Sequence, residues 1–200
     1  MGIGVAVHRN ELEPLRYRWT VDAFYRAVDA GVFEEPRRIE VIRGELWEKE
    51  PVNPPHALAT ERIARRFRQL FEPVCWVREE KPVRIAPDSE PIPDVTVVRG
   101  EAENYSEGHP TPADVLLLVE VANSTAAFDT GGKAQLYAEA GIREYWVWLI
   151  PRRELWVYRE SSNGYGAPIV LGENDTIAPL FAPGDQVTVR EFVSGAGRQP

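Results

Sequence analysis

Apolar residues recur at helical spacing in three stretches of the chain. The first helix is expected over residues 21–30, with Thr20 as its N-cap. A third helix is expected over residues 129–140, with its first or second residue as the cap. The second is expected from about residue 56 to 71, and its buried stripe consists of Leu58, Ile63, Phe67, Leu70 and Phe71.

Short apolar or alternating runs between turn-forming residues predict β-strands. A hairpin is expected over residues 38–48, with its turn at Arg43-Gly44. Further strands are expected at 74–77, 82–85, 95–98, 115–121, 145–149, 155–158, 169–170 and 187–189. The acidic stretch 100–112 is rich in turn formers and is expected to be a surface loop. Because strands outnumber helices, the pattern predicts an α/β or α+β fold with a mixed β-sheet flanked by helices.

Length and composition are those of one globular domain. The 200 residues are expected to form a single domain, with a core at about 15–160, a C-terminal β extension at 161–195 and a polar tail. No apolar run approaches the roughly 20 residues that a membrane span needs, and residues 1–7 are too short for a signal-peptide core. The single cysteine, Cys75, excludes an internal disulfide, fits a cytoplasmic protein and is expected to be buried.

The charge balance limits how the chain could bind nucleic acid. A formal net charge of −8 argues against indiscriminate coating of nucleic acid, which depends on many Lys and Arg contacts to phosphates. The second predicted helix nevertheless carries four arginines, and Arg62 and Arg66 among them are candidates for contacts with a phosphate backbone. The alternative is a solvated helix face on which these arginines alternate with glutamates.

Chemistry is concentrated at two acidic residues and one lysine. Glu120 interrupts the most apolar segment of the chain, VLLLVEV at 115–121, where an ionised carboxylate requires a partner or a metal ion. Asp94 stands at the start of the strand expected at 95–98. Lys133 precedes Leu136, Tyr137 and Ala140 at spacings of three, four and seven residues, so it is expected on the buried face of its helix. A simple salt bridge with Glu120 is the alternative for Lys133.

This combination of residues predicts a site for Mg²⁺ or Mn²⁺. Hard cations prefer oxygen ligands, which Asp94, Glu120 and the backbone carbonyl of Val121 could supply. A bound ion would activate water for the hydrolysis of a phosphodiester bond. Lys133 would then orient that water or stabilise the charge of the transition state.

The same residues resemble the PD-(D/E)XK nuclease superfamily and, more narrowly, its Uma-type restriction endonuclease family of bacteria. The matching segments are IEVIRGEL at 39–46, PDV at 93–95, VEVANST at 119–125, DTGGK at 129–133, LYAEAGI at 136–142 and EYW at 144–146. The resemblance implies a restriction-endonuclease-like core that is commonly dimeric. It also implies that Asp94 and Glu120 are metal ligands and that Lys133 is the catalytic lysine. The chain departs from the superfamily pattern at Ala122, where the lysine usually stands.

Two further residues match the family at positions with a second interpretation. Glu40 matches a family glutamate, but it could also lie on the solvent side of its strand. His56 stands where the family often has histidine, and it could contact phosphate or water, or only cap its helix. The function predicted is that of a Mg²⁺-dependent DNA endonuclease. The alternatives are a catalytically inactive dimeric nucleic-acid-binding protein of the same fold and a phosphoesterase that acts on a small nucleotide.

Overall fold

The computed structural model describes residues 16–161 and 164–193. Residues 1–7, which were considered for a signal peptide, and the polar tail after residue 193 lie outside the described residues. In the part of the chain that is described, no helix combines the length and the apolar character that crossing a membrane requires.

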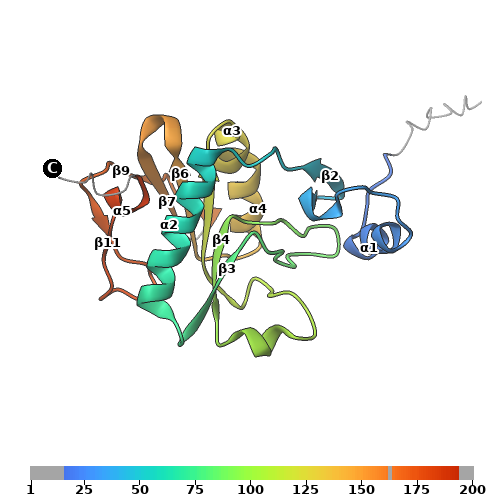
Figure 1. Cartoon of the computed structure of the whole chain (residues 1–200), viewed down its shortest axis with the longest axis horizontal. Helices are drawn as coiled ribbons and strands as arrows, with labels where there is room; N and C mark the ends of the chain where they lie inside the picture. Colours follow the sequence, from blue (N-terminus) through green and yellow to red (C-terminus); the bar gives the residue numbers. More distant parts are fainter. Residues whose placement is uncertain (1–15, 162–163, 194–200) are drawn as a thin grey trace, which may run out of the picture.

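A mixed sheet of seven strands forms the centre of the molecule (Figure 1), which confirms the predicted fold class. β5 and β6 pair in parallel, and the other neighbours in the sheet are antiparallel. β7 is bordered on its outer side by both β8 and β9. The strands are β3 (Cys75–Glu79), β4 (Val95–Arg99), β5 (Val115–Ala122), β6 (Glu144–Leu149), β7 (Glu154–Ser161), β8 (Gly164–Tyr165) and β9 (Ile169–Leu171).

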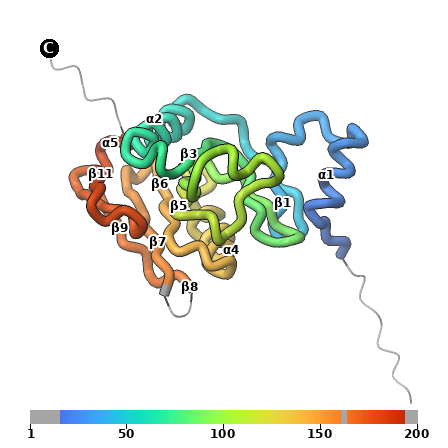
Figure 2. Tube along the Cα trace, turned by 90° about the horizontal axis from the view of Figure 1, so that it is seen from below, coloured from blue at the N-terminus to red at the C-terminus, as the bar shows by residue number. Residues whose placement is uncertain are grey.

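Helices cover both faces of this sheet, because the residues of its central strands are apolar on both sides. α2 (Pro54–Phe71) packs on one face, where Phe67 joins a cluster with Val97 and Trp146. The other face is covered by α3 (Ala126–Phe128), the π-helical turn η3 (Asp129–Lys133) and α4 (Ala134–Glu139), with Tyr137 in a second cluster. Figure 2 shows α2 and α4 on opposite sides of the strands.

The N-terminal part forms one end of the molecule (Figure 1), where α1 (Val21–Asp29), the short 3₁₀ helix η1 (Pro36–Arg38) and the hairpin of β1 (Ile39–Ile42) and β2 (Glu45–Glu48) lie together. The Thr20 side chain accepts a hydrogen bond of 3.1 Å from the Ala23 N–H, as expected of an N-cap. The hairpin turn is at the predicted position, and Gly44 provides the positive φ of +72° there.

The C-terminal part returns to the central layers. β10 (Thr176–Ile177) and β11 (Val187–Thr188) form a separate two-stranded sheet, and α5 (Arg190–Val193) packs against α2. Short 3₁₀ helices occur in two connections, η2 (Ala102–Tyr105) and η4 (Ile150–Arg152). The predicted extension is therefore partly helical, and its first two strands belong to the main sheet.

Three local predictions are wrong. Residues 82–85 form no strand, because the N–H groups of Val83 and Arg84 donate to two separate loops, at Pro91 and Pro110. Leu58 is 49% exposed, since the buried stripe of α2 follows its neighbour Ala59 instead. The third helical segment begins at Ala126, so Asp129 lies inside it rather than at its cap. Cys75 is buried as predicted.

Candidate active site

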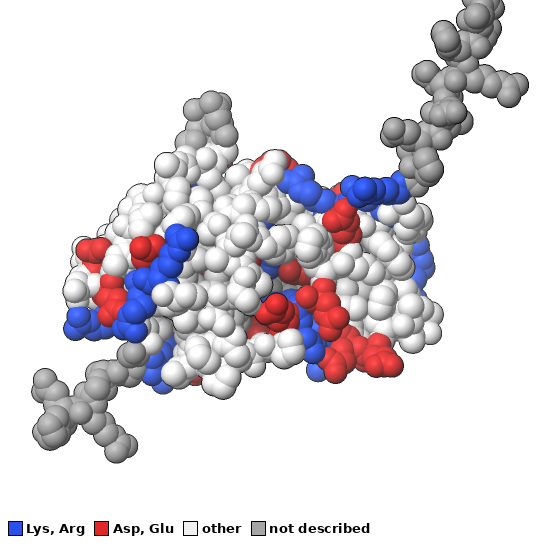
Figure 3. Space-filling model, turned by 90° about the horizontal axis from the view of Figure 1, so that it is seen from above, with Lys and Arg blue, Asp and Glu red and all other residues white. Residues whose placement is uncertain are grey.

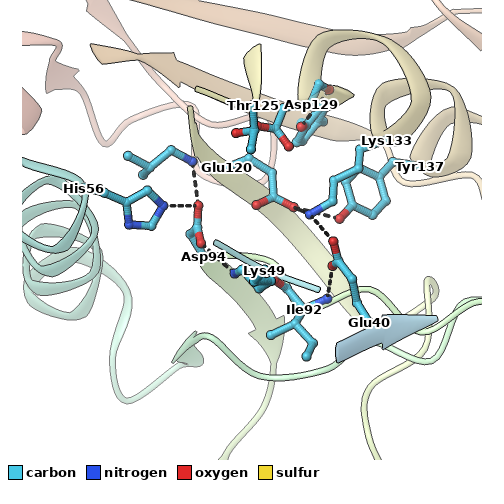
Figure 4. Close-up of polar contacts among 12 residues, drawn as sticks. Glu40, Lys49, His56, Ile92, Asp94, Glu120, Thr125, Asp129, Lys133 and Tyr137 are labelled. Carbon is cyan, nitrogen blue, oxygen red and sulfur yellow. Dashed lines mark hydrogen bonds and ion pairs between the residues drawn. The ribbon is translucent and has the colours of Figure 1, made fainter. Parts of the chain in front are cut away.

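Glu120 lies near the end of the central strand β5 and is 2% exposed. Its Oε1 atom accepts hydrogen bonds from Lys133 Nζ at 3.0 Å and from the Tyr137 hydroxyl at 2.9 Å. Both donors come from the helical segment that follows β5 (Figure 4). The partner that the apolar surroundings of Glu120 required is therefore Lys133, on the buried helix face that the sequence predicted.

Glu40 is a second anionic partner of Lys133. The Glu40 Oε1 atom lies 3.1 Å from Lys133 Nζ, and its Oε2 atom accepts a 2.9 Å hydrogen bond from the Ile92 N–H. Glu40 is buried in the structure, which excludes a position on the solvent side of β1. One buried ammonium thus connects the hairpin to β5.

Asp94 precedes β4 and has a different set of partners. Its Oδ1 atom lies 3.0 Å from Lys49 Nζ, and its Oδ2 atom lies 3.1 Å from His56 Nε2. Oδ2 also accepts a 2.8 Å hydrogen bond from the Val121 N–H. Because the N–H and C=O of one residue in a strand point to the same side, the Val121 carbonyl faces Asp94 as well. Asp94 and the end of β5 therefore share one site.

Lys49 and His56, at the two ends of the connection between β2 and α2, both contact the Asp94 carboxylate. His56 lies in the first turn of α2, where its backbone N–H donates to the Asn53 side chain at 3.1 Å. The cap is thus Asn53, and the imidazole of His56 is free to reach the carboxylate. Lys49 also donates to the Ile92 carbonyl at 3.0 Å. Sequence reasoning missed Lys49 as a site residue, although its rarity was a usable signal, since it is one of three lysines.

The π-helical turn η3 determines where Lys133 points. A π turn leaves backbone carbonyls without their usual helical donors, and two tyrosines of the sheet replace them. The hydroxyl of Tyr145 donates to the Asp129 carbonyl at 3.0 Å, and that of Tyr158 donates to the Thr130 carbonyl at 3.4 Å. The turn is therefore held against β6 and β7, and it directs Lys133 towards Glu120. The sequence pattern gave no sign of this turn beyond the two adjacent glycines.

Ala122 stands where the resemblance to the nuclease superfamily implies a lysine, and it is fully buried. Ala122 packs in the apolar cluster that also contains Tyr137 and Leu149. A lysine side chain at this position would have to displace part of that cluster. Lys133 instead brings its ammonium to Glu120 from the following helical segment.

The surroundings shift the pKa values of the two acidic groups of the site in opposite directions. Burial, together with the charge of Asp94, raises the pKa of Glu120 to about 8, although Lys133 opposes the shift. Burial also acts against ionisation of Asp94, but the His56 hydrogen bond and the Lys49 charge hold its pKa below the usual range. Burial disfavours the Lys133 ammonium too, yet Glu120 and Glu40 keep its pKa well above the ordinary value. The carboxyl group of Asp94 is therefore more acidic than that of Glu120.

The donor set suits a hard cation that retains water or substrate ligands. Among the described residues, no three His, Cys, Asp or Glu side chains are grouped as a metal cluster. The hydrogen bonds that Glu120 accepts within this part of the chain both go to Oε1, so Oε2 remains for a ligand. Mg²⁺ commonly takes one or two carboxylates and completes its shell with water and phosphate oxygens. Asp94, Glu120 and the Val121 carbonyl match that requirement.

These groups line a cavity of about 230 Å³ between the hairpin, α2 and α3. All five predicted side chains, Glu40, His56, Asp94, Glu120 and Lys133, contribute to its wall, as does Val121. The wall also contains groups that were not predicted as site residues, among them Trp47, Lys49, Phe128 and Asp129. Asp129 is buried there, and its carboxylate accepts a 2.5 Å hydrogen bond from Thr125.

Arg62 and Arg66 lie on α2 and do not line this cavity. Arg66 forms a 2.5 Å ion pair with Glu191 of α5, so part of its charge is already neutralised. On the face drawn in Figure 3, acidic and basic side chains of the described residues form small mixed groups separated by uncharged surface. Contact of Arg62 and Arg66 with nucleic acid stays a prediction.

Comparison with known proteins agrees with this fold. A crystal structure described as that of "a putative nuclease belonging to DUF820 from Anabaena variabilis ATCC 29413" is similar in fold, with a TM-score of 0.69. The two sequences are 15% identical, and the match covers 87% of this chain and 97% of the other. No curated protein sequence matches the chain. The model of the Uma2 family, described as "Putative restriction endonuclease", matches residues 21–190. The chain therefore belongs to the Uma2 family, as the resemblance of its motifs indicated.

Proposed function

We propose that this protein is a Mg²⁺- or Mn²⁺-dependent DNA endonuclease. One observation carries the proposal: Asp94 and Glu120 lie at the ends of neighbouring strands in one cavity, with the Lys133 ammonium 3.0 Å from Glu120. Two carboxylates and a buried ammonium are the groups that metal-assisted phosphodiester hydrolysis requires. The description of the family as restriction endonucleases supports the same chemistry.

Each residue has a distinct role in this proposal. Asp94, Glu120 and the Val121 carbonyl would hold the cation, which would lower the pKa of a water molecule and offset charge on the phosphate. Lys133 would orient the attacking water and donate to the phosphate oxygen on which charge develops. Glu40 holds Lys133 in its charged form, while His56 and Lys49 fix the orientation of Asp94.

The inactive binding protein and the small-nucleotide phosphoesterase remain as outcomes of the test. Ala122 was the ground for suspecting lost activity, but Lys133 supplies an ammonium at hydrogen-bonding distance from Glu120. The position of Lys133 therefore favours an active enzyme over a binding protein. The deep cavity is compatible with a small substrate, which makes the substrate comparison necessary.

The test is to incubate the purified protein with supercoiled plasmid and with circular single-stranded DNA, each with Mg²⁺, Mn²⁺ or chelator. We expect nicking or linearisation of at least one circle with metal, and none with chelator. Glu120→Gln should abolish cleavage, whereas Glu61→Gln, on the exposed side of α2, should not change it. Metal-dependent hydrolysis of bis(p-nitrophenyl) phosphate without cleavage of either circle would identify a phosphoesterase. DNA binding that persists in chelator, with no hydrolysis under any condition, would identify a binding protein.

The proposal also includes a homodimer that acts in the cytoplasm. The dimer rests on the resemblance to the nuclease superfamily, and the cytoplasm on the single buried cysteine, which fits a reducing compartment. Light scattering of the purified protein measures its oligomeric state directly. A monomer at micromolar concentration would remove the dimer from the proposal without affecting the site.

A further inference from the structure

Two aromatic side chains form part of the wall of the cavity without any assigned role. Trp47 of β2 and Phe128 of α3 are stacked, with ring centroids 4.7 Å apart and planes inclined by 30°. Trp47 is 40% exposed, so part of its ring is accessible to a ligand. The Phe128 ring in turn lies 5.8 Å from Lys133 Nζ. The aromatic pair therefore extends from the catalytic lysine to the mouth of the cavity.

The position of Phe128 depends on the glycine-containing π turn behind it. A Cβ atom at Gly132 would lie 3.4 Å from Cε2 of the Phe128 ring, so the turn passes within van der Waals distance of the ring. The same turn thus places both the ammonium and the stacked ring.

The negative charge of the cavity wall disfavours binding of the phosphate backbone of nucleic acid. Its carboxylates outnumber its lysines, and they belong to Glu40, Glu48, Glu50, Asp94, Glu120 and Asp129. The two lysines, Lys49 and Lys133, are already paired with site carboxylates. Glu48 and Glu50 are exposed at the mouth. Affinity for nucleic acid at this mouth must therefore come from something other than phosphate contacts.

A hydrogen bond also joins two segments at the rim of the cavity. The Ser124 hydroxyl donates to Glu50 Oε2 at 2.6 Å, which joins the β2–α2 connection to the β5–α3 loop across the cavity. The acids at the floor, Asp94 and Glu120, are only 3% and 2% exposed. A scissile phosphate must therefore enter the cavity to reach them. An unpaired nucleotide can bend inwards while its base stays outside, but a paired one is held to its complement.

We infer that Trp47, supported by Phe128, is a stacking platform for an unpaired nucleobase next to the scissile phosphate. Single-stranded DNA, or an unpaired segment of a duplex, is then the substrate class of this site. This inference rests on the proposed function and specifies its substrate. Aromatic stacking suits the site because it requires no positive charge and accepts any base.

The test is direct binding of a fluorescein-labelled oligothymidylate and of a blunt duplex of equal length, with Ca²⁺ as a cation that takes the same oxygen ligands. We expect the single strand to bind more tightly and to quench tryptophan fluorescence. Trp47→Ala should weaken single-strand binding by roughly 5- to 150-fold, the range of one lost stacked base. Trp47→Phe should retain most of the affinity but lose most of the quenching.

Trp76→Ala is the matched control, because Trp76 also stacks on a ring, that of Tyr105 at 5.8 Å, but does not line the cavity. It should leave affinity and quenching unchanged. Duplex binding as tight as single-strand binding, or unchanged affinity in a folded Trp47→Ala variant, would overturn the inference. If Trp47→Ala binds the single strand as tightly as the wild type and still cleaves DNA with Mg²⁺, the inference fails and the proposed function stands. If neither DNA circle is cleaved by the wild type, the proposed function itself fails.

Discussion

Lys133 Nζ lies 3.1 Å from Glu40 Oε1, so one buried ion pair joins the N-terminal hairpin to the helical segment that follows β5. The same ammonium serves Glu120, and all three side chains are buried. A buried charge that loses its partner is costly, whereas an intact pair contributes little net stability. The effects of substitutions at Glu40 and Lys133 on stability should therefore not be additive.

Lys133→Met should lower the free energy of unfolding by about 3–5 kcal/mol, because it leaves Glu40 and Glu120 buried without a cation. Adding Glu40→Gln to Lys133→Met should recover part of that loss, which a double-mutant cycle from urea unfolding measures. The single variant Glu40→Gln should cost less, about 1–3 kcal/mol, since Lys133 keeps Glu120. Strictly additive effects of the two substitutions would contradict a direct pair.

Asp94→Asn and Glu120→Gln should change the stability of the metal-free protein in opposite directions. The pKa of Asp94 is held below its usual range, so its charge stabilises the folded state at neutral pH, and Asp94→Asn should be destabilising. The pKa of Glu120 is raised, so the neutral Glu120→Gln should be as stable as wild type or more stable, by about 1 kcal/mol.

Thermal melts in chelator measure this difference, and a titration with Mn²⁺ tests the ligands. The wild type should melt at progressively higher temperature as Mn²⁺ rises, following mass action. Neither variant should respond as strongly, whereas the surface variant Glu61→Gln should respond in full. Equal responses of all four proteins would mean that neither acid is a ligand.

His109 should make stability depend on pH outside the active site. Burial lowers the pKa of His109. The carboxylate of Glu90 opposes this shift, whereas three nearby cations, Arg78, Arg84 and Lys81, add to it. The folded state then binds fewer protons than the unfolded state, so His109 destabilises the protein as pH falls through its ordinary pKa of 6.5.

The measurement is the free energy of unfolding of wild type and His109→Gln above and below that pH. The wild type should lose stability relative to the variant on the acid side only. A difference that is constant with pH would show that the imidazole titrates as it does in the unfolded chain.

Replacing Arg62 and Arg66 by alanine should weaken DNA binding about equally for all sequences and flatten its salt dependence, if α2 contacts the phosphate backbone. Arg66 is partly neutralised by Glu191, so Arg62→Ala should change the salt slope more than Arg66→Ala. Binding titrations over a range of salt concentrations give both slopes. An unchanged slope in the double variant would place the binding surface elsewhere.

The sequence predicted those parts of the site whose signal is local. Glu120 interrupts an apolar strand, and the helical spacing of Lys133 shows its inward face, so their contact followed from two short segments. The cap at Thr20 and the hairpin turn also depend only on neighbouring residues. The remaining features depend on tertiary structure. Lys49 reaches Asp94 from a connection distant in sequence, and no periodicity marks it.

The failures have the same origin. Residues 82–85 have the composition of a strand, but Val83 and Arg84 donate to different loops instead of to one neighbouring strand. The helix after β5 was expected to begin at Asp129, yet the chain starts it at Ala126 and accommodates a π turn that two tyrosines stabilise. Such hydrogen bonds exist only after β6 and β7 have joined the sheet.

Because β5 and β6 pair in parallel, the segment that joins them passes close to the acidic residues at the end of β5. Parallel neighbours cannot be joined by a tight turn, so the chain must leave the carboxyl end of β5 and cross over through a helix. The first turns of that crossover necessarily pass the acids at the strand end. A lysine in the crossover can therefore reach Glu120 without any change in the sheet, as Lys133 does.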